Sequence, residues 1–255
     1  MINLLIKIKN ILIRNIFTLL GVFGLLIVII LLFINNSSTP NKGESYCILK
    51  GSKNAKTDKV IRQTGVDKKK IVKASLDTNN GFGFTYSCWL YINTMDYKKD
   101  SELKPVFYKS SKKDLVKKEN LINSDYAPGV FLLKSNTLRV IMNTGSNAEM
   151  VDITNIPIKK WVHLGLYVFQ ESMDVYINGQ MVDSKRFSKP PKQNDGDIYI
   201  NTYGGYDGMI SDLHFYNYPI SYEKLKKIMR KGPSTSSCCS KEIPPYFNNK
   251  WWLFN

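Results

Sequence analysis

Short segments in which apolar and polar residues alternate follow one another from Phe82 onward, with turn residues between them. In FGFTYSCWLYI, this alternation puts every second residue from Phe82 to Ile92 on one face. Asn178-Gly179, between two such segments, is typical of a two-residue hairpin turn, because both positions need a positive φ. Closely spaced short strands without helices between them predict an all-β antiparallel sandwich or barrel.

The remaining expected strands have similar lengths. They cover residues 130–134, 137–144, 161–170, 173–183, 197–203 and 209–217. One short helix is expected after them in SYEKLKKIMRKG, where Ser221 can cap the start and Gly232 can end the helix. Its apolar stripe, Leu225, Ile228 and Met229, predicts that one helix face packs on the sandwich.

An uncharged apolar run over residues 16–34 precedes the strands. A helix of this length spans roughly 28 Å, close to the hydrocarbon thickness of a bilayer. A cleaved signal peptide is the alternative, but bulky residues at 29–34 favour an uncleaved transmembrane anchor. Lys7, Lys9 and Arg14 precede the run, which predicts a cytosolic N-terminus and a C-terminal domain across the membrane.

The chain carries 36 basic and 21 acidic residues, for a formal net charge of +15. Lysines concentrate in residues 50–73 and 98–118, which fit either a solvated linker and loop or contacts to an anionic partner. The candidate contacts are Lys68, Lys69, Lys70, Lys112, Lys113, Lys117 and Lys118. Nucleic acid is not expected, because these stretches have few aromatic residues for stacking and lie across a membrane.

Four cysteines permit two disulfides in three connectivities. Cys88 lies within an apolar strand pattern and is expected to be a buried thiol. The candidate disulfide joins Cys47 to Cys238 or Cys239 and would fasten the N-terminal part of the domain to the tail. Without a CxxC pair and with two histidines, a zinc site is not expected.

Three segments resemble the laminin G-like and pentraxin-like branch of the concanavalin A-like lectins and glucanases. They are FTYSCWLYI (84–92), KKWVHLGLYVFQESMDVYINGQMVD (159–183) and GDIYINTYGGYDGMISDLHFYNYPIS (196–221). This resemblance covers residues 72–231 and implies a two-sheet jelly roll with a shallow concave face. The family is mostly a binding fold with some calcium-dependent members, so the fold by itself does not determine the function.

The resemblance also suggests roles for single residues. Trp161 is expected to fill the core at a strand start, and Asp207 is expected to satisfy backbone donors at a corner. Aromatic side chains that could stack on a glycan at the concave face are Trp89, Tyr91, Tyr203 and Tyr206. No metal is assigned, and calcium stays open as a cofactor because Asp195, Asp197 and Asp207 are close in sequence but lack a recognised metal motif.

Catalysis is not expected. Hydrolases with this fold display two acids on one strand as nucleophile and acid, in the pattern E-x-D-x-x-E, which this chain lacks. His163 falls on a core strand and is interpreted as structural. The chain is therefore expected not to be an enzyme.

A tail follows the helix, and its Pro244-Pro245 pair precedes a group of aromatic residues. These rings either pack on the sandwich or dock onto a partner. The candidate docking residues are Tyr246, Phe247, Trp251, Trp252 and Phe254. The chain thus divides into a basic cytosolic segment (1–15), an anchor (16–34), a lysine-rich linker (35–71), the sandwich (72–231) and the tail (232–255).

Two functions remain open. The first is a structural membrane protein whose sandwich docks onto neighbouring proteins. Its composition, rich in lysine, asparagine and isoleucine, and its single anchored domain are similar to membrane proteins of large DNA viruses. In such a virus it would link an internal virion membrane to capsid proteins. The second is a surface lectin for attachment to glycans; a glycoside hydrolase is a distant third.

Overall fold

The computed structural model describes residues 6, 7, 9, 15, 16, 18, 20–30, 43–63, 72, 74, 75, 77, 78, 81–99, 101–111, 125–145 and 147–234. The chain divides into two compact units, Met1–Lys42 and Gly43–Asn255. In the first unit, residues 20–30 are helical. No helix within the described residues is long and apolar enough to cross a membrane. Residues 31–34 of the expected anchor lie outside the described part of the chain.

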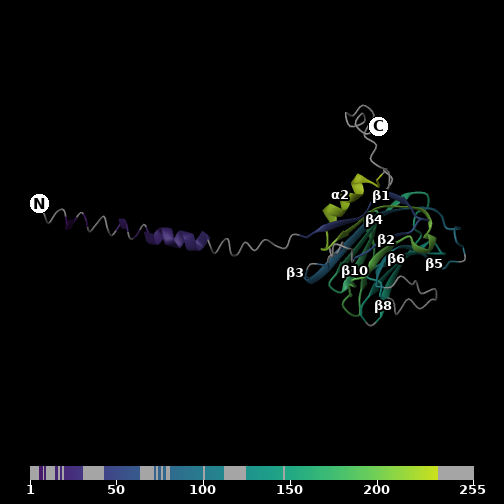
Figure 1. Ribbon diagram of the computed structural model, residues 1–255, viewed down its shortest axis with the longest axis horizontal. Coiled ribbons are helices and arrows are strands. Elements are labelled where there is room, and N and C mark those ends of the chain that lie inside the picture. Colours follow the sequence, from purple (N-terminus) through teal and green to yellow (C-terminus); the bar gives the residue numbers. More distant parts are fainter. Residues whose placement is uncertain are drawn as a thin grey trace, which may run out of the picture. The chain divides into compact units, whose positions relative to one another are not determined.

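The second unit is built from two antiparallel sheets (Figure 1). In its described part, the first sheet has seven strands in the order β1 (Ser45–Asn54), β13 (Asp207–Tyr216), β4 (Gly81–Thr94), β9 (Trp161–Phe169), β10 (Ser172–Ile177) and β11 (Gln180–Arg186), with β3 (Asp77–Thr78) paired to β4. The second sheet has the order β2 (Lys59–Ile61), β12 (Asp197–Ile200), β5 (Leu103–Ser110), β6 (Gly129–Leu133), β7 (Thr137–Asn143) and β8 (Ala148–Thr154). This architecture confirms the predicted all-β jelly-roll sandwich.

The core lies between the two sheets, and the alternation along each strand explains which side chains enter it. On β4, Phe84, Tyr86, Cys88, Leu90 and Ile92 are buried in this core, as predicted. The residues between them point to the outer face of the first sheet, because successive side chains of a strand alternate between faces.

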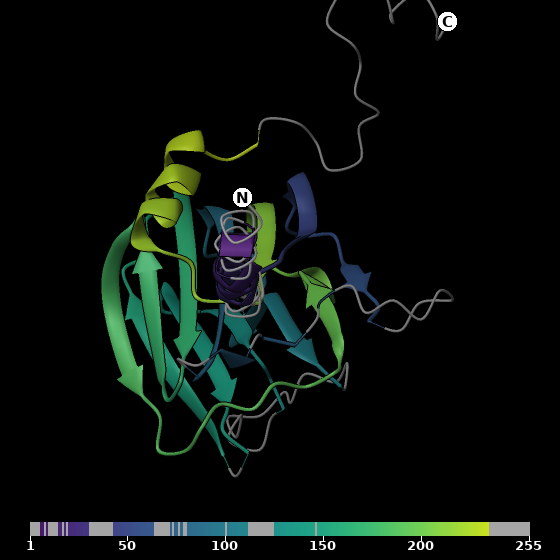
Figure 2. The same ribbon diagram turned by 90° about the vertical axis from the view of Figure 1, so that its left-hand side faces the viewer.

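One short helix, α2 (Tyr222–Lys231), packs on the outer face of the first sheet, as predicted (Figure 2). Ser221 caps the helix by accepting a hydrogen bond from the Lys224 backbone N–H. Leu225 is fully buried against Gly165 of β9, where a side chain on Gly165 would meet Leu225 Cδ1 at 3.1 Å. The glycine therefore lets the helix approach the sheet closely.

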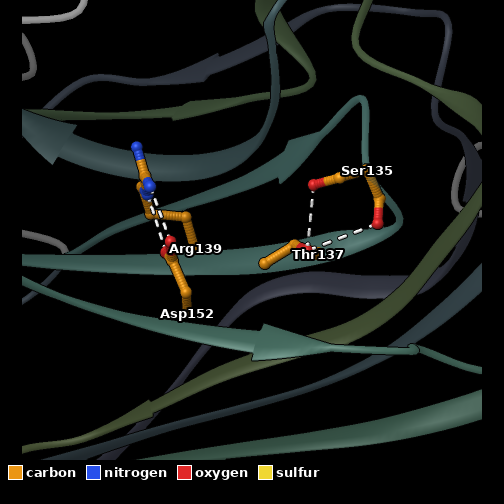
Figure 3. A network of polar contacts seen from close by, with 4 residues as sticks. All are labelled: Ser135, Thr137, Arg139 and Asp152. Atoms are coloured by element: carbon orange, nitrogen blue, oxygen red, sulfur yellow. Dashed lines mark hydrogen bonds and ion pairs between the residues drawn. The ribbon is translucent and has the colours of Figure 1, made fainter.

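Side-chain pairs fix the register of the outer strands in the second sheet. Arg139 of β7 lies directly opposite Asp152 of β8 and donates two hydrogen bonds to its carboxylate, at 2.7 and 2.6 Å (Figure 3). At the hairpin before β7, the Ser135 and Thr137 hydroxyls lie 3.1 Å apart. A one-residue slip would separate Arg139 from Asp152, so the pair favours the observed register.

The outer face of the second sheet holds a separate aromatic cluster. The rings of Tyr108 and Tyr199 stack at 4.9 Å, and Phe131 stacks on the other side of Tyr108 at 5.9 Å. Tyr126 meets both Tyr108 and Phe131 edge-on. All four rings are buried, so this face offers a ligand no exposed aromatic surface from the cluster.

Two segments interpreted from sequence as linker or loop contribute strands to the sandwich. Within the predicted linker and entry segment 35–71, SYCILK was expected to be a strand and forms the start of β1, whereas β2 was not predicted. Residues 103–110 form β5 within the lysine-rich stretch 98–118. The lysines there conceal the strand pattern, because Lys104 and Lys109 are buried while their ammonium groups reach the backbone oxygens of Met95 and Asn194.

Candidate functional site: a basic rim

Loops from both sheets meet at one end of the sandwich. We call this end the rim and define it as residues 55–58, 93–99, 134–136, 155–160 and 201–207. Hydrogen bonds tie these loops together. Ala55 N–H donates to Gly208 O at 3.0 Å, and Lys159 N–H donates to Ile92 O at 2.7 Å. The Asn136 amide donates to Ile156 O at 3.1 Å. The rim is therefore one connected surface rather than a set of independent loops.

The rim carries an excess of positive charge. It contains six lysines, Lys56, Lys98, Lys99, Lys134, Lys159 and Lys160, against three aspartates, Asp58, Asp96 and Asp207. Lys56 pairs with Asp207 at 2.5 Å, and Lys99 pairs with Asp96 at 3.7 Å. The other four lysines are exposed, and none of them has an ion-pair partner among the described residues.

Aromatic rings lie among these cations. The Lys56 ammonium sits 4.7 Å from the centre of the Tyr97 ring, and the Lys98 ammonium sits 5.7 Å from the same ring. Lys98 also donates to the backbone oxygen of Tyr203, whose side chain is 43% exposed. The Asp58 carboxylate accepts from Gly204 N–H at 3.4 Å. These contacts hold two tyrosines and two lysines within one small part of the rim.

The backbone of the rim is strained at the positions that carry these side chains. Lys98, Lys159 and Tyr203 have φ values of 50°, 59° and 55°, in the left-handed region. Glycine adopts this region freely and asparagine tolerates it, whereas other residues pay about 1–2 kcal/mol. A sequence selected only for stability would place glycine or asparagine at these positions. This chain does have asparagine at two other left-handed positions of the rim, Asn136 and Asn155. Backbone strain of this kind is concentrated at functional sites.

Asp207 is held by side chains of the rim. Its carboxylate accepts from Lys56 Nζ and, at 2.7 Å, from Asn93 Nδ2, and the hydrogen bond from Lys56 is the main reason that its pKa is lowered. The prediction that Asp207 satisfies backbone donors is therefore wrong, because its hydrogen-bond partners are side chains. Among the residues that the structure describes, no group of three or more His, Cys, Asp and Glu side chains could hold a metal ion.

The four residues predicted to stack on a glycan do not share a surface. Tyr206 is 1% exposed inside the core, so its prediction as a stacking residue is wrong. Trp89 and Tyr91 lie on the outer face of the first sheet, where Trp89 is 8% exposed and meets His163 edge-on at 5.0 Å. Of the four, only Tyr203 is exposed at the rim.

Trp161 is only half-buried, which differs from its expected place in the core. It lies opposite Tyr91, and the two rings are 5.5 Å apart on the outer face of the first sheet. The alternation of side chains along β9 explains the difference. Val162 and Leu164 point into the core, so Trp161 points to the opposite face.

Other predicted site residues lie outside the described part of the chain. These are Lys68, Lys69, Lys70, Lys112, Lys113, Lys117, Lys118, Cys238, Cys239, Tyr246, Phe247, Trp251, Trp252 and Phe254. The rim lysines at 134, 159 and 160 were not predicted as contacts, whereas Lys56 lies in the basic stretch 50–73 that was predicted to fit an anionic partner. The sequence did contain a signal for two of these lysines. Lys159-Lys160 directly precedes the strand that begins at Trp161, which places both lysines in a loop at the end of the sandwich.

Ser87 and His163 form a buried pair with the spacing of a serine–histidine catalytic dyad. The Ser87 hydroxyl lies 2.9 Å from His163 Nε2, but Ser87 is 2% exposed and His163 is fully buried. Burial lowers the pKa of His163 to about 4. A nucleophile must reach its substrate, so this pair has the character of a structural contact.

Two antiparallel sheets that pack around a common core, with connected loops at one end, define the class of β-sandwich proteins. Residues 64–226 match the family model described as the concanavalin A-like lectin/glucanases superfamily. The chain therefore belongs to this superfamily. No curated protein matches the sequence.

Solved structures with a similar arrangement include binding domains of botulinum neurotoxins. The serotype D binding domain is 12% identical with a TM-score of 0.49, over 76% of this chain and 47% of that one. The serotype G binding domain is 11% identical with a TM-score of 0.48, over 76% and 47%. This chain thus spans about half the length of those structures.

Proposed function

We propose that this protein is a non-enzymatic, membrane-anchored docking protein whose rim binds an acidic face of a neighbouring protein. The observation that carries this proposal is the left-handed backbone at Lys98, Lys159 and Tyr203. Each position retains a long side chain at a cost in stability, and two of the three side chains are cations. An anionic partner would explain why these side chains are kept.

Buried aromatic rings on both sheets favour protein docking over glycan binding at a concave face. The aromatic cluster on the second sheet is buried, and Trp89 on the first sheet is nearly so. Glycan stacking requires exposed rings, and of the four predicted stacking residues only Tyr203, which lies on a loop, is exposed. Tyrosine is enriched in protein interfaces, and the rim lysines would give electrostatic complementarity to an acidic partner.

The position of the rim also fits a tethered protein. Residue 43, where the second unit begins, adjoins the start of β1, and Ser45 pairs with Tyr216 at the end of β13. The rim instead lies where β1 ends and β13 begins. We propose that residues 16–34 anchor the chain and that the rim, at the other end of these strands, binds the partner. In a virion, this arrangement would join an internal membrane to a capsid protein.

Cross-linking mass spectrometry of the intact native membrane or particle tests the proposal. We expect lysine-reactive links from Lys134, Lys159 and Lys160 to one or two abundant proteins. Lys189 and Lys192 provide the internal control, because they are exposed but lie near Glu149 and Asn143, at the far ends of β8 and β7 from the rim. Links that are confined to the chain itself would contradict docking.

A charge-reversal pair gives the matched comparison. Lys159→Glu with Lys160→Glu changes the charge by the same amount as Lys189→Glu with Lys192→Glu. We expect only the rim pair to reduce partner recovery, by tenfold or more, and to make the residual binding less salt-dependent. Equal losses in both variants would contradict a specific rim site. Binding to a glycan array that Tyr203→Ala abolishes, without any protein link, would support the lectin instead.

A further inference from the structure

Helix α2 presents a strongly basic surface to solvent. Five of its ten residues are Lys or Arg, and Glu223 is its one acidic residue. Lys224 is half-buried, and its ammonium lies 4.6 and 5.0 Å from the centres of the Tyr216 and Tyr218 rings. The other four cations are exposed, and no ion-pair partner for them occurs among the described residues. These four, which we call the helix patch, are Lys226, Lys227, Arg230 and Lys231.

The helix patch is held in a fixed array. On the opposite side of the helix, Leu225 is fully buried against Gly165. Just beyond the last turn, Ser234 N–H donates to Asp212 Oδ2 at 2.9 Å, which fastens this end of the helix to the sheet. Successive residues of an α-helix are rotated by about 100°, so the four cations fall within about 140° of the helix circumference. They therefore point away from the sheet together.

Helix stability does not explain this array. Lys226 and Arg230 are four residues apart, as are Lys227 and Lys231, and like charges at this spacing destabilise a helix. The negative C-terminal end of the helix dipole favours Arg230 and Lys231, which lie in the last turn. It does not favour the two lysines one turn earlier. An anionic partner would offset the repulsion among all four cations.

The exposed side of the helix distinguishes between two kinds of anionic partner. Besides the helix patch, the exposed residues of α2 are Glu223 and Tyr222. The core of a specific protein interface is apolar or aromatic and depleted of charge, and the middle of this surface carries charges alone. Attraction to anionic lipid headgroups needs no apolar core, and clusters of about four to eight Lys or Arg residues on a helix are typical of it.

The shape of the surface and its one exposed ring agree with a bilayer. The helix lies on the outside of the first sheet, so its exposed side is convex (Figure 2). Tyr222 is 48% exposed, and the Lys226 ammonium lies 4.5 Å from the centre of its ring. Tyrosine is enriched at the interface between membrane and water, where its ring and hydroxyl meet different surroundings.

We propose that the helix patch binds the anionic headgroups of a phospholipid bilayer. The patch belongs to a face of the sandwich, whereas the rim lies at one end of it, so the two are separate surfaces. The inference goes beyond the docking function, and it depends neither on the rim nor on residues 16–34.

Lysine footprinting of the full-length protein with lipid nanodiscs tests the proposal. The discs contain phosphatidylcholine alone or phosphatidylcholine with about 30% phosphatidylserine, and an amine-reactive label is read by peptide mass spectrometry. With the anionic discs only, we expect labelling of Lys226, Lys227 and Lys231 to fall about fivefold or more. Salt at about 1 M, where the Debye length is about 3 Å, should restore it. Three rim lysines in the same sample should keep their labelling: Lys134, Lys159 and Lys160.

Two charge-matched variants give a second readout. Arg230→Gln removes one cation and leaves the three lysine reporters in place, and glutamine keeps the helix propensity. It should lower the equilibrium constant for docking about fivefold, since one cation near an anionic surface contributes about 1 kcal/mol. Lys160→Gln removes the same charge from the rim and should leave the protection unchanged.

Equal labelling of the helix patch in the two lipids would overturn the proposal. Protection by the native membrane but not by the phosphatidylserine discs would also overturn it, because it would assign the helix patch to an acidic protein. The docking function can fail separately, since cross-links from the rim lysines test it in a different experiment.

Discussion

His163 Nε2 lies 2.9 Å from the Ser87 hydroxyl on the outer face of the first sheet, in a place that solvent does not reach. The other ring nitrogen, Nδ1, has no hydrogen-bond partner among the described residues. A proton on this ring would bring a charge into a buried site without a carboxylate to balance it. Burial accordingly lowers the pKa of His163 from 6.5 to about 4.

This shift predicts that the protein loses stability in mild acid. Below pH 6.5 the unfolded chain binds a proton at His163, whereas the folded protein does not until the pH approaches 4. The free energy of unfolding should therefore fall by about 3 kcal/mol between pH 7 and pH 4 from this group. Denaturant unfolding at a series of pH values measures it, and His163→Gln should remove this part of the decline. An unchanged pH slope in the variant would contradict the assignment.

Relief of backbone strain gives a prediction at the rim. Lys159→Gly should raise the free energy of unfolding by about 0.5–1 kcal/mol, because glycine adopts a φ of 59° without the steric cost of a side chain. The same variant should bind the partner more weakly. Lys160→Gly is the control. The backbone of Lys160 lies outside the left-handed region, so glycine at this position should destabilise the protein. A loss of stability in Lys159→Gly would show that the lysine is retained for folding.

The Arg139–Asp152 pair should stabilise the outer strands by a measurable amount. Its two short hydrogen bonds and partial burial distinguish it from the exposed Lys99–Asp96 pair at 3.7 Å. A double-mutant cycle of Arg139→Leu and Asp152→Ala should give a coupling energy of about 0.5–1 kcal/mol. The corresponding cycle at Lys99 and Asp96 should give no measurable coupling, and equal values for the two cycles would contradict the distinction.

Helix α2 should depend on one side chain for its attachment. Leu225→Ala removes a fully buried side chain that packs against Gly165, and we expect a loss of about 3 kcal/mol in the free energy of unfolding. Lys227→Ala, on the exposed side of the same helix, should change it by less than about 0.5 kcal/mol. A small effect of Leu225→Ala would mean that the sheet face stays covered without this contact.

Features fixed by local chemistry could be predicted from the sequence. The face of β4 that enters the core, the Asn178-Gly179 turn and the Ser221 cap each depend on residues within a few positions of one another. Asn178 and Gly179 have φ values of 50° and 76°, as the two-residue hairpin requires. Strand β5 was not found, since its buried lysines reach oxygens that are distant in sequence or lie outside the strand.

The candidate site was harder to predict for a specific reason. Alternation along β12 carries into the next segment only if the backbone stays extended, but Asn201 and Tyr203 adopt left-handed conformations. The periodicity is therefore lost between Ile200 and Asp207, and Tyr203 becomes exposed while Tyr206 enters the core. The rim depends on contacts between separate loops, and a single strand pattern does not contain them.

The neighbouring positions of β1 and β13 have a consequence for how the chain is made. Ser45 pairs with Tyr216, so one of the earliest strands to be synthesised finds its partner only after most of the domain has followed. Hairpins such as β9–β10–β11 can form as soon as they emerge, whereas pairing across such a long separation is slow. A ribosome that stalls before Asp207 would leave β4 with an open edge, the surface on which incomplete β proteins aggregate. The last strand to appear thus determines when this sandwich becomes safe from misassembly.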